Sequence, residues 1–266
     1  MKERIITALL FGAAVIIFSL IGGFIFTLFV LAIATIGMNE LLKMKKLSLF
    51  SLPGLLSMLL MWSLFIPNDW LETSLLNGMS KIELSIFIVI LLLLSTVITK
   101  NKFSFDEVGF IVISATYVGF GFHYFMMTRH IPEDGLAILF FIIFTIWATD
   151  SGAYFVGRTF GKRKLSPIIS PNKTIEGSLG GIGTAFLIGI IFQLVYPTFD
   201  SWLTVFIVTI VTSICGQLGD LIESAFKRHF EVKDSGNILP GHGGILDRFD
   251  SLLYVMPILH ILKLIL

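Results

Sequence analysis

Long apolar blocks dominate this chain, and each is about as long as the apolar core of a lipid bilayer is thick. A helix needs about 20 apolar residues to cross that core, with a range of roughly 17–25. Nine segments approach or meet this length: residues 5–21, 24–42, 49–66, 83–99, 108–127, 136–157, 177–196, 202–222 and 251–266. None alternates like a barrel strand, and helices satisfy their own backbone hydrogen bonds in lipid. The sequence therefore predicts an all-α, polytopic transmembrane helical bundle of about nine spans.

Composition agrees with this class. Only 14% of the 266 residues are charged, against roughly 25% in an ordinary soluble domain. The first apolar stretch continues to about Leu42, far beyond the roughly 7–15 residues of a signal-peptide core, so we expect two retained helices that meet near Gly22 and Gly23. Cys215 is the single cysteine, which excludes an intramolecular disulfide and a cysteine metal cluster.

The basic residues are distributed unevenly between the two sides of such a bundle. If the N-terminus is cytoplasmic, all but Lys81, Arg129 and Lys263 of the 19 Lys and Arg fall in internal segments or at their edges. The positive-inside rule predicts this asymmetry. We therefore expect an integral protein of the cell (cytoplasmic or inner) membrane. The polar segments 150–176 and 220–250 then share the cytoplasmic side, and an active site is expected at that membrane edge.

The chemistry-bearing residues are concentrated in one half of the chain. This predicts N-terminal transmembrane helices in residues 1–105 and a C-terminal transmembrane catalytic region in residues 106–266. Glycines 177, 180, 181 and 183 open the seventh expected span. Gly181, Ala185 and Gly189 fall four apart, which favours close helix packing. A phosphate-binding glycine loop is the alternative.

Asp150 is an ionisable residue inside an expected span. It precedes Arg158 by eight residues, which places it about 12 Å inside the span's end at 1.5 Å per residue. A charge at that depth is costly unless it is paired or lines a polar cavity, so a functional role is the default interpretation. A structural ion pair or a helix–helix hydrogen bond is the alternative.

A second polar group lies at the cytoplasmic end of the eighth span. On a helix, Asp220, Glu223, Ser224 and Lys227 share one stripe. A solvated helix end with an internal Glu223–Lys227 pair explains the same residues. Asp234 and His242 follow in the same short, highly charged segment.

Asp247 and Asp250 lie three residues apart before the last span. One could cap that helix and the other could favour its dipole. Capping does not explain why Asp220 accompanies them. Three carboxylates, completed by water and phosphate oxygens, would form an octahedral shell for Mg²⁺.

Basic residues near these carboxylates suit phosphate groups. Residues 170–177 read as a turn that leads into a helix, and Lys173 with the exposed N–H groups there favours an anion. Lys227, Arg228 and Lys233 could bind a second anionic group, or they could only anchor the membrane edge. His242 could bind a phosphate or a base, or make only a structural hydrogen bond.

A long motif then resembles a known family. It comprises Ser224, Lys227, Arg228, Lys233, Asp234, Gly236, Leu239, Pro240, His242, Gly243, Gly244, Asp247, Arg248 and Asp250. In these positions the chain resembles the phosphatidate cytidylyltransferase (CDP-diacylglycerol synthase) family, and the resemblance extends through residues 150–154, 170–177 and 219–220. The first 100 residues are similar only as hydrophobic spans.

The resemblance implies the reaction CTP + phosphatidate → CDP-diacylglycerol + pyrophosphate, dependent on Mg²⁺, with a second cation possible. It implies catalytic roles for Asp220, Asp247, Asp250, Lys227 and Arg228, the three aspartates as metal ligands. It implies substrate-binding roles for Asp150, Ser170, Asn172, Lys173, Glu223, Ser224, Lys233, Asp234, His242 and Arg248. The expected partners are CTP and the phosphatidate lipid, with a homo-oligomer as an open alternative to a monomer, but no nucleic acid.

The residues present suit this chemistry. The nucleophile is a phosphate oxygen that is already anionic near pH 7, so no strong general base is needed. Catalysis must come from neutralising charge and aligning two polyanions for in-line attack. We expect Lys173 to hold CTP phosphates and Arg228 to grip phosphatidate.

Three other functions are alternatives for a membrane protein with such a charged segment. A CTP-dependent polyprenol or phytol kinase would transfer a γ-phosphoryl group to a lipid alcohol, and that alcohol would need a base. A CDP-alcohol phosphotransferase is disfavoured because its aspartate-rich motif is absent. A transporter would keep polar groups near the midplane and show related halves, whereas here the charges crowd one face and no repeat is visible.

Overall fold

A computed structural model of the chain describes the backbone of residues 2–67, 70 and 79–265, and their side chains except those of residues 2–5 and 8. The side chains of Lys2 and Arg4, which enter the expected charge asymmetry, lie outside this set. So does Leu266, the expected end of the last span.

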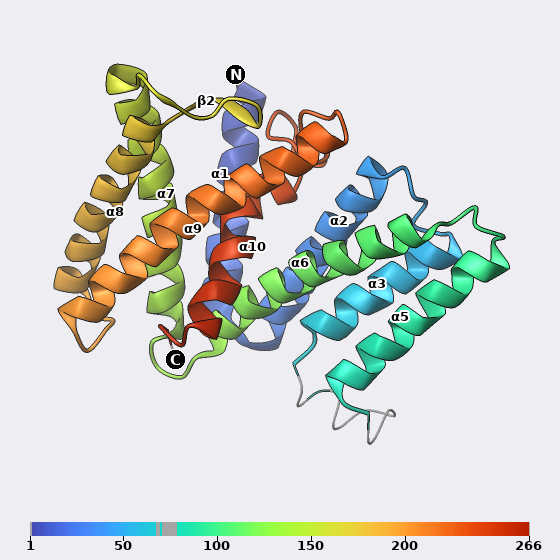
Figure 1. Cartoon of the computed structure of the whole chain (residues 1–266). Helices are drawn as coiled ribbons and strands as arrows, with labels where there is room; N and C mark the ends of the chain where they lie inside the picture. Colours follow the sequence, from blue (N-terminus) through green and yellow to red (C-terminus); the bar gives the residue numbers. More distant parts are fainter. Residues whose placement is uncertain (1, 68–69, 71–78, 266) are drawn as a thin grey trace.

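Within the described residues, each expected span corresponds to one helix (Figure 1). The helices are α1 (Lys2–Ile21), α2 (Gly23–Met44), α3 (Leu52–Phe65), α5 (Lys81–Ile98), α6 (Phe105–His130), α7 (Gly135–Phe160), α8 (Ile175–Val195), α9 (Trp202–His229) and α10 (Leu246–Ile261). The helical membrane-protein class is thereby confirmed. Six of these helices, α2 and α5 to α9, are long and apolar enough to cross a membrane. The apolar helices Leu9–Ile21, within α1, and α3 are shorter.

Most helices begin where a local side chain can accept a backbone N–H. Ser51 caps α3, Thr174 caps α8, and Ser80 and Ser104 form capping boxes at the starts of α5 and α6. These caps satisfy N–H groups that have no partner inside the helix. The starts of α2, α7 and α10 have no local side-chain cap, and at α10 the preceding residue is the apolar Ile245.

A short hairpin interrupts the helices between α7 and α8. Strands β1 (Lys164–Ser166) and β2 (Ser170–Thr174) pair antiparallel, with Lys164 opposite Thr174 and Ser166 opposite Ser170. The segment expected as a turn before the seventh span is thus mainly a strand, although it does lead directly into α8. The hairpin is a small addition to a helical fold that agrees with the all-α expectation, and it forms because the preceding residues supply a partner strand that no pattern within 170–177 reveals.

The glycines of α8 allow it to pack closely on its neighbours. A Cβ at Gly181 would lie 2.7 Å from the carbonyl oxygen of Thr149 in α7, and one at Gly189 would lie 2.7 Å from the Thr209 hydroxyl in α9. A Cβ at Gly180 would collide with Val156. The packing interpretation of the glycine run is therefore confirmed.

Aromatic rings join the two halves of the chain in one core. Phe26 of α2 contacts Phe125 of α6, with ring centroids 5.6 Å apart. Phe249 of α10 meets Phe125 edge to face, also at 5.6 Å. The division into residues 1–105 and 106–266 stays a prediction, and the contacts show that α2 packs directly against α6.

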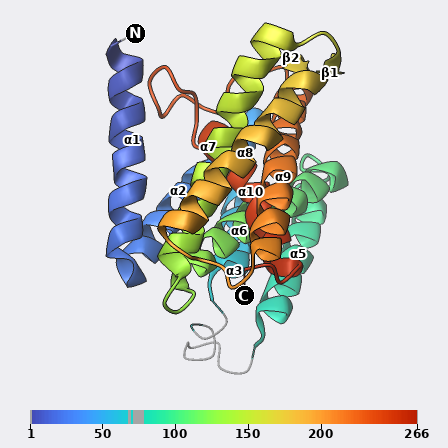
Figure 2. The same cartoon turned by 90° about the vertical axis from the view of Figure 1, so that its left-hand side faces the viewer.

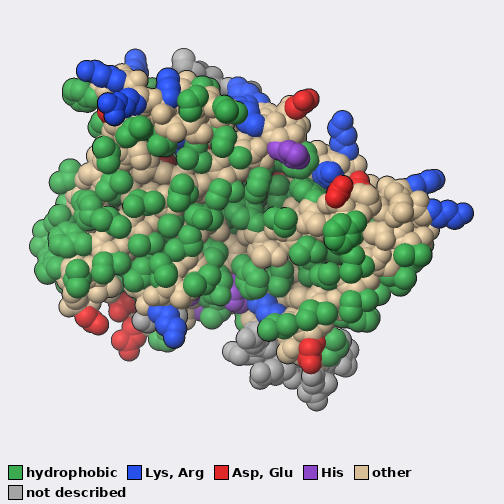
Figure 3. Space-filling model, in the orientation of Figure 1, with side chains coloured by type: hydrophobic (Ala, Val, Ile, Leu, Met, Phe, Trp, Pro, Cys, Tyr) green, Lys and Arg blue, Asp and Glu red, His purple; other side chains and the backbone are tan. Residues whose placement is uncertain are grey.

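Charge is distributed unevenly over the surface. Figure 3 shows Lys and Arg side chains gathered along the upper edge, where the ends of α2, α7 and α9 lie in Figure 1. Apolar side chains form a broad band below that edge. The hairpin and the N-terminal end of α10 lie at the same edge as the basic side chains.

Candidate active site

A cavity of about 940 Å³ opens where the C-terminal parts of α7 and α9, strand β2 and the start of α10 converge. Ten predicted site residues line it: Asp150, Asn172, Lys173, Asp220, Lys227, Asp234, His242, Asp247, Arg248 and Asp250. A smaller adjoining cavity is lined by Lys233 and also by Asp234, His242 and Arg248. Residues of both polar segments, 150–176 and 220–250, thus line one cavity, whereas their expected position on the cytoplasmic side stays a prediction.

The other end of the main cavity is apolar. Phe11 and Val15 of α1 form one wall, and Ile143, Phe144 and Trp147 of α7 form another. Figure 2 shows α1 standing at one side of the bundle. The cavity thus joins a charged end to an apolar end, which suits a ligand that has both characters.

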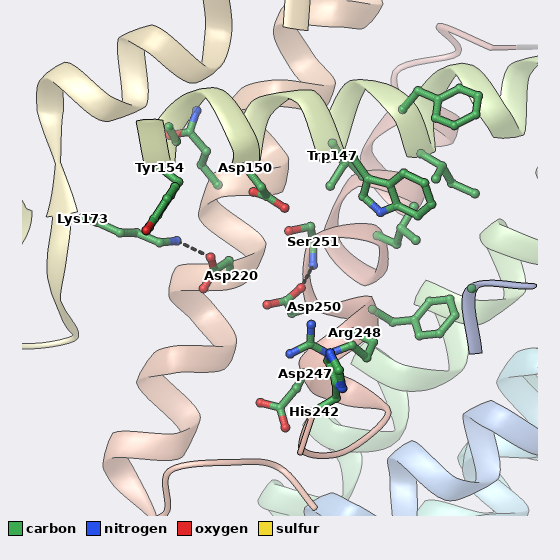
Figure 4. Close-up of a pocket in the computed structure, with 18 of the residues that line it drawn as sticks. Trp147, Asp150, Tyr154, Lys173, Asp220, His242, Asp247, Arg248, Asp250 and Ser251 are labelled. Carbon is green, nitrogen blue, oxygen red and sulfur yellow. Dashed lines mark hydrogen bonds and ion pairs between the residues drawn. The ribbon is translucent and has the colours of Figure 1, made fainter. Parts of the chain in front are cut away.

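Three carboxylates from three helices point into the charged end (Figure 4). They are Asp150 of α7, Asp220 of α9 and Asp250 of α10. Each is close enough to the others for their negative charges to repel. Lys173 of β2 offsets part of this charge, because its Nζ lies 2.5 Å from Asp220 Oδ2.

Asp247 lies in a different environment from this trio. Its Oδ2 accepts hydrogen bonds from Ser235 N at 2.7 Å, Ser235 Oγ at 2.8 Å and Gly244 N at 2.8 Å. Its Oδ1 accepts from Lys227 Nζ at 2.6 Å. Asp247 lies within the first turn of α10 and does not occupy the cap position, so it ties the preceding loop to the helix.

Lys227 bridges two buried carboxylates. Its Nζ lies 2.6 Å from Glu223 Oε2 and 2.6 Å from Asp247 Oδ1. The Glu223–Lys227 pair of the alternative interpretation is therefore present, but it is buried, since Glu223 is only 1% exposed. Within the described residues, the other oxygen of Glu223 has no hydrogen-bond partner. An ammonium has three N–H donors, so Lys227 keeps one for a ligand in the cavity.

Four predicted site residues line neither cavity: Ser170, Glu223, Ser224 and Arg228. Ser224 Oγ donates to Asp220 Oδ1 at 3.3 Å, so it touches the site indirectly. Arg228 is exposed, and its Nε donates to the carbonyl oxygen of Ile169 at 3.3 Å, which ties α9 to the hairpin. Direct substrate contact by these four residues stays a prediction.

His242 and Arg248 are the polar groups most open to a ligand. His242 Nδ1 is buried and has no hydrogen-bond partner among the described residues. No hydrogen bond or ion pair holds the guanidinium of Arg248 within the part of the chain that the structure describes. Figure 4 shows it beside Asp250 and His242. Both side chains line the main and the smaller cavity.

Sequence reasoning missed some of the lining. Tyr154, Arg158 and Gln217 also line the main cavity, and Arg158 Nη1 donates to the Tyr154 hydroxyl at 3.2 Å. The sequence does indicate Tyr154 and Arg158, because they follow Asp150 at intervals of four residues and so share one helix face with it.

The oxygen donors of the site suit a hard cation such as Mg²⁺. Among the described residues, no three His, Cys, Asp or Glu side chains are grouped so as to hold one ion together. Mg²⁺ is commonly bound by one or two carboxylates, with waters and substrate phosphates as the remaining ligands. Asp220 and Asp250 fit this mode, with Asp150 beside them. Within the described part of the chain, only Lys173 and Ser224 donate to Asp220, whereas four donors engage the two oxygens of Asp247. The predicted metal role of Asp247 stays a prediction.

Comparison with known proteins places the chain in a family. Residues 2–266 match the sequence model of the cytidylyltransferase family. A phosphatidate cytidylyltransferase of Bacillus subtilis is 51% identical over 98% of this chain and 97% of the relative. Proteins of the same name from Staphylococcus epidermidis and Staphylococcus aureus are 46% and 42% identical, each over 98% of both chains. The resemblance expected from the motif is thereby confirmed, and the chain belongs to the phosphatidate cytidylyltransferase family.

Proposed function

We propose that this protein transfers a cytidylyl group from CTP to phosphatidate, which yields CDP-diacylglycerol and pyrophosphate. The full-length similarity to proteins named for this activity supports the proposal. The observation that carries it is the cavity itself. Its charged end, with Lys173 and Arg248, suits two phosphate-bearing groups, and its apolar end, beside Phe11 and Trp147, suits acyl chains.

In this reaction a phosphate oxygen of phosphatidate attacks the α-phosphorus of CTP. A new P–O bond forms there, and the bond to the bridging oxygen breaks, so that pyrophosphate leaves with the electron pair. The attacking oxygen is already anionic, which removes the need for a strong base. The protein must instead bring two polyanions together in line.

Three cations at the charged end serve that purpose. Arg248 is free to bind a phosphate through two parallel N–H donors. Lys227 has one donor left, aimed by its two carboxylate partners. Lys173 binds Asp220 through one of its three donors and can bind phosphate through the others. Fixing these cations before the substrates arrive lowers the reorganisation that the transition state requires.

Asp220 and Asp250 would hold Mg²⁺, with Asp247 as the third ligand that the sequence predicts. The ion would neutralise phosphate charge and orient the phosphates. Asp150 and Asp250 form no ion pair within the described residues, so their charges most need such a counter-ion. A second cation beside Asp150 would offset the remaining repulsion.

We also infer how the protein lies in the membrane. With the N-terminus in the cytoplasm and nine crossings, the described helices alternate in direction and the cavity faces the cytoplasm. The gathering of Lys and Arg at the cavity's edge supports this orientation. CTP would then enter from the water, and phosphatidate would enter sideways from the bilayer in the cell membrane.

A direct test uses purified protein in phospholipid micelles with phosphatidate, Mg²⁺ and CTP labelled at either the α- or the γ-phosphate. We expect α-label in a lipid product and γ-label in pyrophosphate. Lipid that carries the γ-label would identify a kinase and refute the proposal. CTP that crosses a proteoliposome unchanged, without pyrophosphate release, would identify a transporter.

A further inference from the structure

Glu40 is a buried acidic residue near the C-terminal end of α2, in the half of the chain that carries none of the predicted site residues. Its side chain is only 4% exposed. A buried carboxylate is costly unless donors surround it. Glu40 has three, one of them the Ser235 hydroxyl that it shares with Asp247, and all belong to the loop and helix that carry Asp234, Asp247 and Asp250.

The three donors are well placed. Glu40 Oε1 accepts from Ile245 N at 2.8 Å, and Oε2 accepts from Leu246 N at 3.0 Å. Oε2 also accepts from Ser235 Oγ at 3.0 Å. No residue of the described chain lies between these groups and the carboxylate, so the link from α2 to α10 is direct.

The first two contacts replace a missing helix cap. The initial N–H groups of any helix lack partners within it, and Ile245 gives α10 no side-chain cap. Glu40 supplies the acceptor from another helix, and its negative charge also suits the positive end of the α10 dipole.

Two glycines leave room for this carboxylate. A Cβ at Gly236 would lie 2.7 Å from Glu40 Oε1, and a Cβ at Gly244 would collide with the same oxygen. Both glycines belong to the motif around the site. The close approach of Glu40, and at Gly244 also of the Ser235 hydroxyl, leaves no room for a larger side chain at either position.

The third contact continues into the catalytic centre. Ser235 Oγ is shared between Glu40 and Asp247 Oδ2, the latter at 2.8 Å. Asp247 in turn holds Lys227 through Oδ1 at 2.6 Å. A continuous path therefore runs from Glu40 through Ser235 and Asp247 to Lys227, whose ammonium lines the cavity.

We propose that Glu40 is a positioning residue, which caps α10 from α2 and fixes Asp247, Asp250 and Lys227 in their catalytic arrangement. Its effect on turnover rests on the function proposed above, whereas its effect on the loop and on α10 does not. Glu40 touches no substrate, because it does not line either cavity.

The test is Glu40→Gln. The amide keeps the size of the side chain, but its NH₂ group must face the N–H of either Ile245 or Leu246, which then lacks an acceptor. We expect kcat to fall roughly ten- to hundredfold, the range that a misplacement of about 1 Å produces, with smaller changes in KM for either substrate. Hydrogen exchange should accelerate in peptides that cover residues 233–248 and stay unchanged in α7 and α8.

Glu107→Gln is the matched control. Glu107 is also a capping glutamate, since its Oε2 accepts from Ser104 N at 2.6 Å at the start of α6, but that helix end carries no site residue. We expect its kcat to stay within about twofold of wild type. Faster exchange should then be confined to the first turn of α6.

Two results would overturn the proposal. One is a folded Glu40→Gln protein with wild-type kcat, even if it is less stable. The other is unchanged exchange over residues 233–248. If the Gln variant fails to fold, Glu40→Asp keeps the charge on a side chain that is shorter by one methylene. Its kcat should then lie between that of wild type and the reduced value expected for Glu40→Gln. Wild-type kcat in both Glu40→Asp and Ser235→Ala would also refute the proposal. If wild-type protein makes no CDP-diacylglycerol, the proposed function fails, and the exchange measurement still decides the role of Glu40.

Discussion

Replacing Lys227 with methionine tests the bridge at the centre of the site. Methionine keeps most of the length and apolar character of the lysine stem but removes the ammonium. Glu223 and Asp247 then lose the cation that lies 2.6 Å from each of them. Their side chains are only 2% and 5% exposed, so water cannot replace it fully.

The expected cost follows from that burial. Removing one partner of a buried ion pair typically costs about 3–5 kcal/mol, because an uncompensated charge stays behind. Glu223 should bear most of the loss, since Lys227 is its only hydrogen-bond partner among the described side chains and its second oxygen has none. Asp247 keeps three donors from Ser235 and Gly244. Lys227→Met should therefore lower the free energy of unfolding by about 3 kcal/mol or more.

The assay is reversible unfolding of the purified protein in mixed micelles, combined with a double-mutant cycle. Glu223→Gln removes the stranded charge, so in the Lys227→Met background it should restore about half of the lost stability. Lys162→Met, the same substitution at an exposed lysine, should change stability by no more than about 0.5 kcal/mol. A cost below about 1 kcal/mol for Lys227→Met, or a further loss on adding Glu223→Gln, would refute the reasoning.

Three further predictions concern catalysis and orientation. Asp220→Ala and Asp250→Ala should each abolish turnover while the protein stays folded, and near-normal activity at limiting Mg²⁺ would contradict a metal role. Lys173→Ala should mainly raise the apparent KM for CTP, because it removes a hydrogen-bond donor to the phosphates and leaves the charge of Asp220 without its ion-pair partner. An equal rise in the KM for phosphatidate would indicate that both substrates use one anion pocket. Cysteines placed by Lys164→Cys and Glu231→Cys, in a Cys215→Ser background, should react with impermeant reagents only from the cytoplasmic side, and labelling from the opposite side would overturn the orientation.

The helices could be predicted from the sequence because the signal for them is local. The seventh span was expected at residues 177–196, and α8 runs over Ile175–Val195. The last span was expected from residue 251, whereas α10 begins five residues earlier, at Leu246. Its first turn is amphipathic, with Leu246 and Phe249 in the core and Asp247 and Asp250 toward the site. A span predicted from average hydropathy leaves out such a turn, because its two aspartates lower the average.

Part of the site was missed because its contacts are distant in sequence. Asp150 was identified from its depth in an expected span. The same reasoning applies to Glu40, which lies within the expected span 24–42, but no nearby residue drew attention to it. Its partner Ser235 is 195 residues away. Only the packing of α2 beside α10 shows that this acidic residue of the apolar N-terminal part contacts the loop and helix that carry Asp247 and Asp250.

The roles of the individual aspartates depend on the loop more than on their spacing. Residues three apart on a helix differ in direction by only about 60°, so spacing alone makes Asp247 and Asp250 equivalent ligands. The loop before α10 breaks that equivalence, because the backbone N–H groups of Ser235 and Gly244 donate to Asp247 and not to Asp250. Asp247 is thereby fixed and neutralised, whereas Asp250 faces Asp150 and Asp220 across the cavity. Asp250 forms no ion pair within the described residues, so a bound metal would gain most there, and the loop conformation is what separates Asp250 from Asp247.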